Sequence, residues 1–163
     1  MPGRQVGKWQ RLAELLAKST GVPAALIMRA DPLEIGVFVY SDSEVNPYRQ
    51  GGRAKLDTGL YCEMVMASRE PLLVSDATQD LEWDHNPDLK LGMIYYLGFP
   101  LLWPDGQIFG TLCLLDRKDN PEATAKRELM ALLKEAIESD LKSLFESRQA
   151  TDAMIDSEMQ YRQ

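Results

Sequence analysis

Two apolar runs lie near the middle of the chain, at residues 94–103 and 107–115, and Pro104-Asp105-Gly106 separates them. Asp-Gly between two apolar runs predicts a tight hairpin turn, because glycine adopts a positive φ without a steric clash. Apolar residues occupy successive positions in both runs, whereas a strand with one exposed face would alternate with polar residues. The pattern therefore predicts two central strands of a sheet that is covered on both faces.

The rest of the chain alternates between helical and extended apolar patterns. Apolar residues spaced three and four apart predict helices, and short runs rich in β-branched and aromatic residues predict strands. Polar stretches with proline or glycine predict a loop at 41–53, and a polar connection follows at 75–89. The predicted helices are 8–19, a segment capped by Asp57 or Thr58 that ends at 68, and 121 to at least 149; the further predicted strands are 24–29, 34–40 and 71–74.

This order of elements predicts the fold class. Helix, two strands, helix, strand, long connection, hairpin and long helix together indicate an α+β fold with one antiparallel sheet of about five or six strands. We expect the two terminal helices on one face of the sheet, and the middle helix with the loops on the other. Alternation places Tyr95 and Phe99 on one face and Tyr96 on the other. We expect the middle helix and the loops to cover the sheet face that carries Tyr95 and Phe99.

Composition narrows the range of partners. The chain of 163 residues carries a net charge of −7, which argues against electrostatic binding to nucleic acid or to an anionic membrane. No apolar run approaches the roughly 20 residues that a membrane-spanning helix needs, and the N-terminus has no apolar signal core. Cys62 and Cys113 lie in apolar segments without metal-type spacing, which predicts reduced, slowly reacting thiols in a cytoplasmic protein.

The terminal helix carries more apolar residues than one sheet face needs. Apolar residues cover well over half of its circumference, and Met130, Ile137 and Leu144 are spaced by seven, as in a coiled-coil seam. A helix that is apolar on more than one stripe favours a second partner. We therefore expect a homodimer that pairs through the terminal helices, at about 9–19 and 130–145. The alternative is one amphipathic helix packed on its own core.

Four short motifs stand out in the chain: Leu60-Tyr61-Cys62-Glu63, Pro71 to Asp76, Gly98 to Leu101, and the G-x-L-x-L-x-D pattern from Gly110 to Asp116. These motifs resemble those of GAF domains, a family of small-molecule sensor modules in signalling proteins. The resemblance implies a GAF/PAS-like fold, a sensor domain over residues 1–149 and a regulatory role. Residues 60–116 are further similar to GAF domains attached to bacterial histidine kinases of two-component systems and to diguanylate cyclases.

The C-terminal residues, 150–163, are expected to form a linker helix. The apolar pattern thins beyond Gln149, and the ending 157–163 resembles the segment that leads into a PAS domain. The resemblance therefore implies that the chain is a piece of a longer sensor protein. Its output domain would receive the state of the ligand site through the terminal helix.

Aromatic residues and one carboxylate are the candidate ligand-binding residues. We expect a ligand between the sheet face of Tyr95 and Phe99 and the segment 60–83, because a long polar connection packs less densely than a helix and often acts as a lid. Asp76 directly follows a predicted strand, where its carboxylate is placed to anchor a ligand. The alternative is an aromatic core without a pocket. The full candidate set is Tyr61, Asp76, Trp83, Tyr95 and Phe99.

The sequence identifies no cofactor. The pattern of cyclic-nucleotide GAF domains is absent, and neither cysteine has the neighbouring histidine that a covalently bound bilin requires. The methionine sulfoxide reductases of this fold need several loop cysteines, which two cysteines in helix or strand segments do not supply. The one histidine, His85, lacks further soft ligands nearby, and the carboxylates at 76, 80, 84 and 88 lack the spacing of a calcium loop. We therefore expect no metal site.

No catalytic constellation emerges from the sequence. The single histidine has no nucleophile partner, and no glycine-rich phosphate motif occurs. We therefore expect a regulatory module that is not an enzyme and that senses a small molecule. One alternative is a dimerisation module without a ligand. A less favoured alternative is a thiol-dependent reductase that acts through Cys62 or Cys113.

Overall fold

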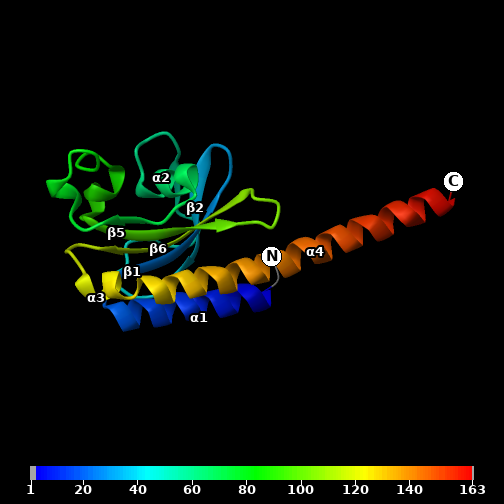
Figure 1. Cartoon of the computed structure of the whole chain (residues 1–163), viewed down its shortest axis with the longest axis horizontal. Helices are drawn as coiled ribbons and strands as arrows, with labels where there is room; N and C mark the ends of the chain where they lie inside the picture. The colour runs from blue at the N-terminus through cyan, green and yellow to red at the C-terminus, as the bar shows by residue number, and fades with distance from the viewer. Residues whose placement is uncertain (1–2, 163) are drawn as a thin grey trace.

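A computed structural model describes residues 3–162 as one six-stranded sheet with helices on its two sides (Figure 1). All neighbouring strands are antiparallel, in the order β3-β2-β1-β6-β5-β4, which confirms the predicted α+β fold. The helices are α1 (Gly3–Thr20), α2 (Tyr61–Ser68), α3 (Pro121–Ala125) and α4 (Arg127–Arg162), with the short 3-10 helices η1 (Ala77–Gln79) and η2 (Pro87–Leu91). The strands are β1 (Ala24–Ala30), β2 (Glu34–Tyr40), β3 (Arg53–Lys55), β4 (Leu72–Val74), β5 (Tyr95–Leu102) and β6 (Ile108–Asp116).

The predicted hairpin is the centre of the sheet. β6 lies between β5 and β1, and Phe99 of β5 pairs with Leu112 of β6. Residues 95–101 and 109–116 are all buried. Gly106 turns the hairpin with φ +87°, as the Asp-Gly pair predicts. Burial on both faces explains why these strands read as continuous apolar runs rather than alternating ones.

Two different layers cover the sheet. α1 and the first part of α4 pack on one face, whereas α2 packs on the other (Figure 1). α1 and α4 run antiparallel: the Trp9 indole donates to Asp140 Oδ2 at 2.9 Å, and Lys126 Nζ donates to the Ser19 carbonyl at 2.6 Å. The predicted division, with terminal helices on one face and the middle helix on the other, is therefore correct.

Some element boundaries differ from the predictions. β3 was not predicted, since the expected loop at 41–53 included Arg53, and Ala54 and Lys55 were assigned to no element. The strand has only three residues, of which Arg53 and Lys55 are exposed and Ala54 is half-buried. Such a short edge strand leaves no apolar pattern to detect. The 75–89 connection contains η1 and most of η2. The predicted terminal helix is split, because α3 ends at Ala125 and Lys126 separates it from α4.

The predicted assignment of the two faces of β5 is wrong. Tyr95 and Phe99 lie in the core cluster under the terminal helices, and the Tyr95 hydroxyl lies 2.9 Å from Thr124 Oγ1. Tyr96 instead points to the side of α2. Because β5 is apolar at every position, its own sequence gave no sign of which face the terminal helices cover.

The expected coiled-coil seam is also placed differently. Met130 and Ile137 are buried in the core of this chain, under the sheet, so they are not available to a partner. The apolar side chains that the helical layer exposes are Leu15, Leu129 and Leu132. Leu144, the third position of the expected seam, is half-buried, so pairing through this layer would use the three exposed leucines with Leu144 rather than Met130 and Ile137.

α4 extends well past the sheet (Figure 1). The described side chains at 146–160 are all exposed. Met154, Ile155 and Met159 are the large apolar side chains among them. Within residues 3–162, none of the helices combines the length and apolar character that crossing a membrane requires.

Among the glycines of the sheet, Gly110 leaves the least room for a side chain, which gives a testable prediction. A Cβ at this position would lie 1.7 Å from the carbonyl oxygen of Met28 on β1. We expect Gly110→Ala to force β1 and β6 apart and to lower the free energy of unfolding by about 2–3 kcal/mol. Urea unfolding, followed by circular dichroism, measures this loss.

Gly7→Ala is the matched control for that prediction. Gly7 lies inside α1, where an added Cβ would meet only Arg11 at 3.8 Å. Replacing a glycine in a helix interior by alanine stabilises a protein by about 0.5–1 kcal/mol. Gly7→Ala should therefore raise the free energy of unfolding, whereas Gly110→Ala should lower it. Equal stability of both variants would contradict the close approach of β1 and β6.

Candidate ligand-binding site

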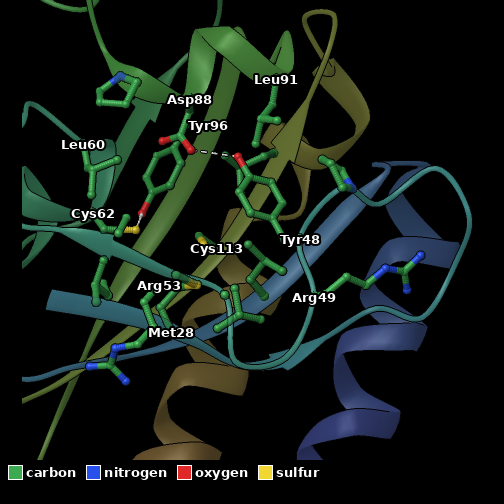
Figure 2. A pocket seen from close by; sticks show the side chains of 18 residues that line it. Met28, Tyr48, Arg49, Arg53, Leu60, Cys62, Asp88, Leu91, Tyr96 and Cys113 are labelled. Atoms are coloured by element: carbon green, nitrogen blue, oxygen red, sulfur yellow. Dashed lines mark hydrogen bonds between the residues drawn. The ribbon is translucent and has the colours of Figure 1, made fainter.

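A cavity of about 290 Å³ lies on the α2 side of the sheet (Figure 2). Its floor is formed by side chains of β1, β2, β5 and β6, and its rim by the loop before β3, the start of α2, and η2. The walls are mainly aliphatic, and a few polar groups converge on the space, which is the usual composition of a small-molecule site. The lining residues are Leu26, Met28, Ile35, Val37, Pro47, Tyr48, Arg49, Gly52, Arg53, Ala54, Leu60, Cys62, Pro87, Asp88, Leu91, Tyr96, Cys113 and Leu115.

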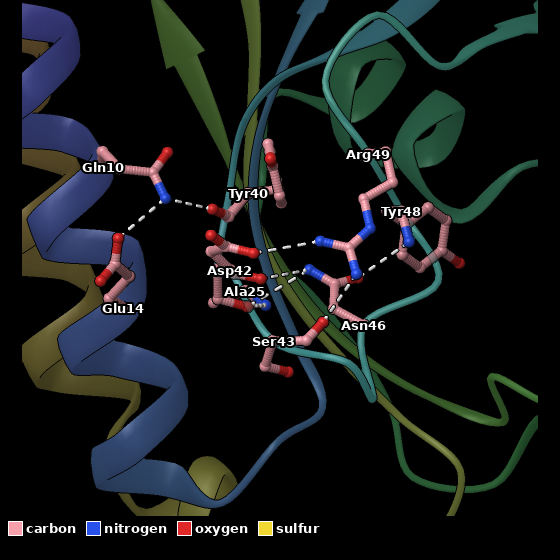
Figure 3. A network of polar contacts seen from close by, with 10 residues as sticks. Gln10, Glu14, Ala25, Tyr40, Asp42, Ser43, Asn46, Tyr48 and Arg49 are labelled. Atoms are coloured by element: carbon pink, nitrogen blue, oxygen red, sulfur yellow. Dashed lines mark hydrogen bonds and ion pairs between the residues drawn. The ribbon is translucent and has the colours of Figure 1, made fainter.

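A polar network holds the loop that carries Tyr48 (Figure 3). The Asn46 amide donates to the Ser41 carbonyl at 2.8 Å, and the Tyr48 N–H donates to Asn46 Oδ1 at 2.9 Å. The Ser41 hydroxyl accepts from the Ala25 N–H of β1 at 3.0 Å. Asn46 is buried, so these hydrogen bonds offset the cost of removing its amide from water. The network therefore ties the cavity loop to the sheet.

η2 positions Asp88 at the opposite side of the cavity. Asn86 caps this turn, because its side chain accepts from the Asp88 N–H at 3.0 Å, and Pro87 follows with the φ that a helix start needs. Gly92 ends the turn with φ +79°, a conformation that glycine adopts without strain. The local sequence Asn-Pro-Asp thus fixes the Asp88 carboxylate at the cavity.

Tyr48 and Asp88 meet across the cavity rim (Figure 2). The Tyr48 hydroxyl donates to Asp88 Oδ1 at 2.8 Å. Burial raises the pKa of the Asp88 carboxyl above its usual value, while the hydrogen bond from Tyr48 acts in the opposite direction. Burial and the nearby Asp88 charge also raise the pKa of Tyr48, so this phenol stays protonated as the donor.

The two cysteines lie together at the floor of the cavity. The Cys62 sulfur is 3.3 Å from the hydroxyls of both Tyr96 and Thr111. Hydrogen bonding with the Cys113 thiol and with these two hydroxyls lowers the pKa of Cys62, although burial opposes the shift. The pKa of Cys113 is raised well above its usual value, by that same hydrogen bond and by burial. The two thiols are therefore not equivalent.

An aromatic stack supports the cavity wall. The rings of Tyr61 and Tyr96 are stacked at 4.7 Å, and Trp83 lies 5.3 Å from Tyr61. The Tyr61 hydroxyl donates to the Met93 carbonyl at 2.8 Å, and burial raises the pKa of Tyr61 to about 12. Gly98 leaves room for the Tyr96 ring, since a Cβ there would lie 2.2 Å from the Tyr96 hydroxyl.

The structure brings together only some of the residues that the sequence suggested. Tyr61 and Trp83 lie next to each other behind Tyr96, outside the cavity lining. The Asp76 carboxylate caps η1, where it accepts from the Thr78 N–H at 3.0 Å and from the Thr78 hydroxyl at 2.6 Å. Tyr95 and Phe99 lie on the opposite sheet face.

The polar residues that line the cavity were not among the binding residues predicted from the sequence. Tyr48 and Asp88 are forty positions apart, and both lie in segments that read only as polar loop. Tyr96 was recognised as the neighbour of Tyr95 on the other face, so period-two alternation would have found it once the helix-covered face was known. Cys62 and Cys113 were expected to pack in the core, with a redox role as the less favoured alternative, and neither was predicted to line a ligand site.

No metal centre is evident in the part of the chain that the structure describes. Within 3–162, no three histidine, cysteine, aspartate or glutamate side chains gather as metal ligands would. His85 is almost fully exposed, and its Nε2 lies 3.4 Å from the neighbouring Asp84.

The family of the chain follows from its sequence as well as its fold. The family model of the GAF domain matches residues 9–138. The chain belongs to the GAF domain family. GAF domains form a family of regulatory, ligand-binding modules, and the cavity described above lies within the matched residues. A comparison with curated proteins found no match.

Solved structures with the same fold come from sensors and from enzymes. The GAF domain of an Acinetobacter phosphoenolpyruvate-protein phosphotransferase has a TM-score of 0.66 at 11% identity, over 89% of this chain and 86% of that one. A Neisseria meningitidis free methionine-R-sulfoxide reductase, in complex with its substrate, has a TM-score of 0.68 at 15% identity, over 90% and 81%. A methyl-accepting chemotaxis protein has a TM-score of 0.64 at 15% identity, over 86% of this chain and 92% of that one. At these identities the likenesses show the fold alone.

The unequal thiols give a prediction for the GAF domain. Tyr96→Phe removes a hydrogen bond to the Cys62 sulfur and should raise the pKa of that thiol, because a hydrogen bond stabilises the thiolate. We expect iodoacetamide to modify Cys62 faster than Cys113 in the native protein, and the variant to slow modification of Cys62 by about threefold. Peptide mass spectrometry measures both rates.

Tyr95→Phe is the matched control for the thiol experiment. It deletes the same hydroxyl from the neighbouring tyrosine, on the sheet face away from the cysteines. The rate at Cys62 should therefore be unchanged. The hydrogen-bonding account fails if Tyr96→Phe and Tyr95→Phe alter the rate equally, or if Cys113 reacts first.

Proposed function

We propose that this GAF domain is a regulatory module that binds a small molecule in the cavity above β1, β2, β5 and β6. The observation that carries this proposal is a mainly aliphatic space of about 290 Å³ into which Tyr48 and Asp88 direct polar groups. A sheet face filled only for packing would have no reason to place a carboxylate and a phenol in an apolar space. This argument favours ligand binding over a domain that only dimerises.

The route from ligand to output runs through the sheet. Tyr96 of β5 lines the cavity, and its neighbour Tyr95 contacts Thr124 beside α4. At the other end of β5, the Leu102 N–H donates to Glu138 of α4 at 2.8 Å. A ligand that shifts β5 would therefore change the packing of α4, provided that it binds the two arrangements with different affinity.

A second link joins the cavity loop to α1. The Gln10 amide of α1 donates to the Tyr40 carbonyl at 2.5 Å, directly before the loop that carries Tyr48 (Figure 3). α1 in turn contacts α4 through Trp9 and Asp140. Both links end on the same helical layer, so that layer is the part of the domain best placed to respond to the ligand.

The wider setting of the domain is part of the same proposal. We place it in a cytoplasmic signalling chain of the histidine kinase or diguanylate cyclase type. Residues 150–163 would act as a linker helix toward a PAS or other output domain. The motif resemblance from 60 to 116 supports this setting. The long, exposed end of α4 also supports it, because a helix without a core of its own suits a connection between domains.

We propose that the domain is not an enzyme. Reductases with this fold lead us to consider Cys62 and Cys113 as redox groups, because both line the cavity and a bound molecule could contact them. The reactive form of a thiol is the thiolate, and the hydrogen bond with Cys62 together with burial raises the pKa of Cys113, which opposes its use as a second redox thiol. The thiol experiment above bears on this alternative, since rapid reaction of Cys62 would favour it.

Filling the cavity tests the proposed function. Ala54 of β3 lines the space at the sheet edge, and we expect Ala54→Phe to occupy it while the edge strand adjusts. Native mass spectrometry of the protein, purified from its own source, should detect a retained small molecule that the variant lacks. Circular dichroism confirms that the variant is folded.

Lys55→Phe controls for the added ring. Lys55 is the next residue along β3 and is exposed, so its ring would lie outside the cavity. This variant should keep the retained molecule. Retention of the molecule by folded Ala54→Phe would show that ligand binding occurs elsewhere and would refute the proposed site.

Self-association through the helical layer is a separate prediction of the proposal. Leu15, Leu129 and Leu132 expose 66%, 43% and 63% of their surface on α1 and α4. We expect Leu132→Glu to convert a dimer to a monomer, because burying an unpaired carboxylate in an apolar interface costs several kcal/mol. Light scattering over a range of concentrations measures the mass.

Gln79→Glu is the control for charge. Gln79 is exposed on η1, on the other side of the sheet, and the change adds the same negative charge. The mass of this variant should equal that of the wild type. A wild-type monomer at high micromolar concentration would refute dimerisation.

A further inference from the structure

The cavity contains one carboxylate without a cationic partner. Among residues 3–162, no lysine or arginine forms an ion pair with Asp88, and Tyr48 is the one side chain that donates a hydrogen bond to it. The carboxylate faces an apolar space, where an unpaired negative charge is costly. An occupant that supplies a positive charge would offset that cost.

The two arginines at the rim form ion pairs with carboxylates outside the cavity. Arg53 pairs with Asp31 and Glu34. Arg49 pairs with Asp42 at 3.2 Å, and its guanidinium also donates to a backbone carbonyl. Both guanidinium groups therefore point to partners at the surface and away from Asp88 (Figure 2). The charge left for a ligand to match is that of Asp88.

The remaining walls define the body of the occupant. Leu26, Met28, Val37 and Leu91 present apolar side chains to the cavity. A volume of about 290 Å³ holds roughly ten non-hydrogen atoms, taking about 30 Å³ for each as in liquid water. The space therefore suits a compact apolar group with one polar end.

We propose that this cavity binds a small organic cation, whose apolar body lies on the β1–β2 floor and whose protonated amine pairs with Asp88. The inference rests on the proposed function and names the ligand class of the same site. An ammonium group supplies donors for a charge-assisted hydrogen bond to the carboxylate. A ligand carboxylate in the same position would be repelled by Asp88, which gives selectivity against anions.

The overall charge of the protein acts in the same direction. A net charge of −7 attracts cations from solution. Burial is the main cause of the raised pKa of Tyr61, and the negative charges of Asp88 and Asp76 add to it, so both carboxylates act on this side of the sheet. The negative charge around the cavity therefore attracts a positively charged ligand during its approach as well as when it is bound.

Three probes of similar size test the charge preference. They are 2-phenylethylamine, 2-phenylethanol and 3-phenylpropionate, which carry a cationic, a neutral and an anionic end on the same ring and short chain. Isothermal titration calorimetry with the whole 163-residue chain measures each affinity. We expect the amine to bind at least about tenfold more tightly than the other two.

Asp88→Asn tests the residue. The asparagine amide oxygen can still accept the hydrogen bond from Tyr48, so the fold should be kept, and circular dichroism checks this. We expect the affinity for 2-phenylethylamine to fall by about tenfold or more, because the charge of the partner is lost. Asp119→Asn makes the same change in net charge at an exposed residue outside the cavity lining and should leave the affinity unchanged.

The outcomes separate this inference from the proposed function. Equal or tighter binding of the alcohol or the carboxylate, an unaffected Asp88→Asn variant, or no binding of any probe at millimolar concentration would overturn the cation inference. The proposed function would survive each of these results if a retained molecule is lost in Ala54→Phe. The proposed function would fail if the folded Ala54→Phe variant still retained that molecule.

Discussion

The central pair of strands, β5 and β6, is apolar on both faces, so each face of the sheet must be covered by other segments of the chain. One face is covered by long helices, whose side chains interlock with the sheet and leave a dense core. The other face is covered by one short helix, two 3-10 turns and a loop. Irregular segments carry backbone polar groups that need partners, so they fill space less completely. The cavity follows from this unequal cover.

Much of the fold could be predicted from local sequence patterns. The hairpin was found because Asp105-Gly106 interrupts two apolar runs, and strand 34–40 because it is rich in β-branched residues. β3 was missed because it pairs at an edge with only one inward residue. The choice of face for Tyr95 also failed, because each residue of β5 is apolar and the helices alone decide which set they cover.

The candidate site was harder to predict than the fold. Tyr61 and Trp83 were chosen for their aromatic character, and they are indeed adjacent, but as a support behind Tyr96. Tyr48 and Asp88 meet only because the cavity loop and η2 fold over the same part of the sheet. Such a contact depends on long-range packing, which leaves no periodic signal in either segment.

β3 gives the cavity an unusual outer wall. It is three residues long, pairs with β2 alone, and lines the space with Ala54. A strand held by one neighbour opens at a small free-energy cost compared with global unfolding. Exchange of an occupant would therefore proceed through local opening of this edge while the central strands stay paired. The response time of such a sensor would be set by the length of its edge strand, and evolution could tune it without altering the residues that determine affinity.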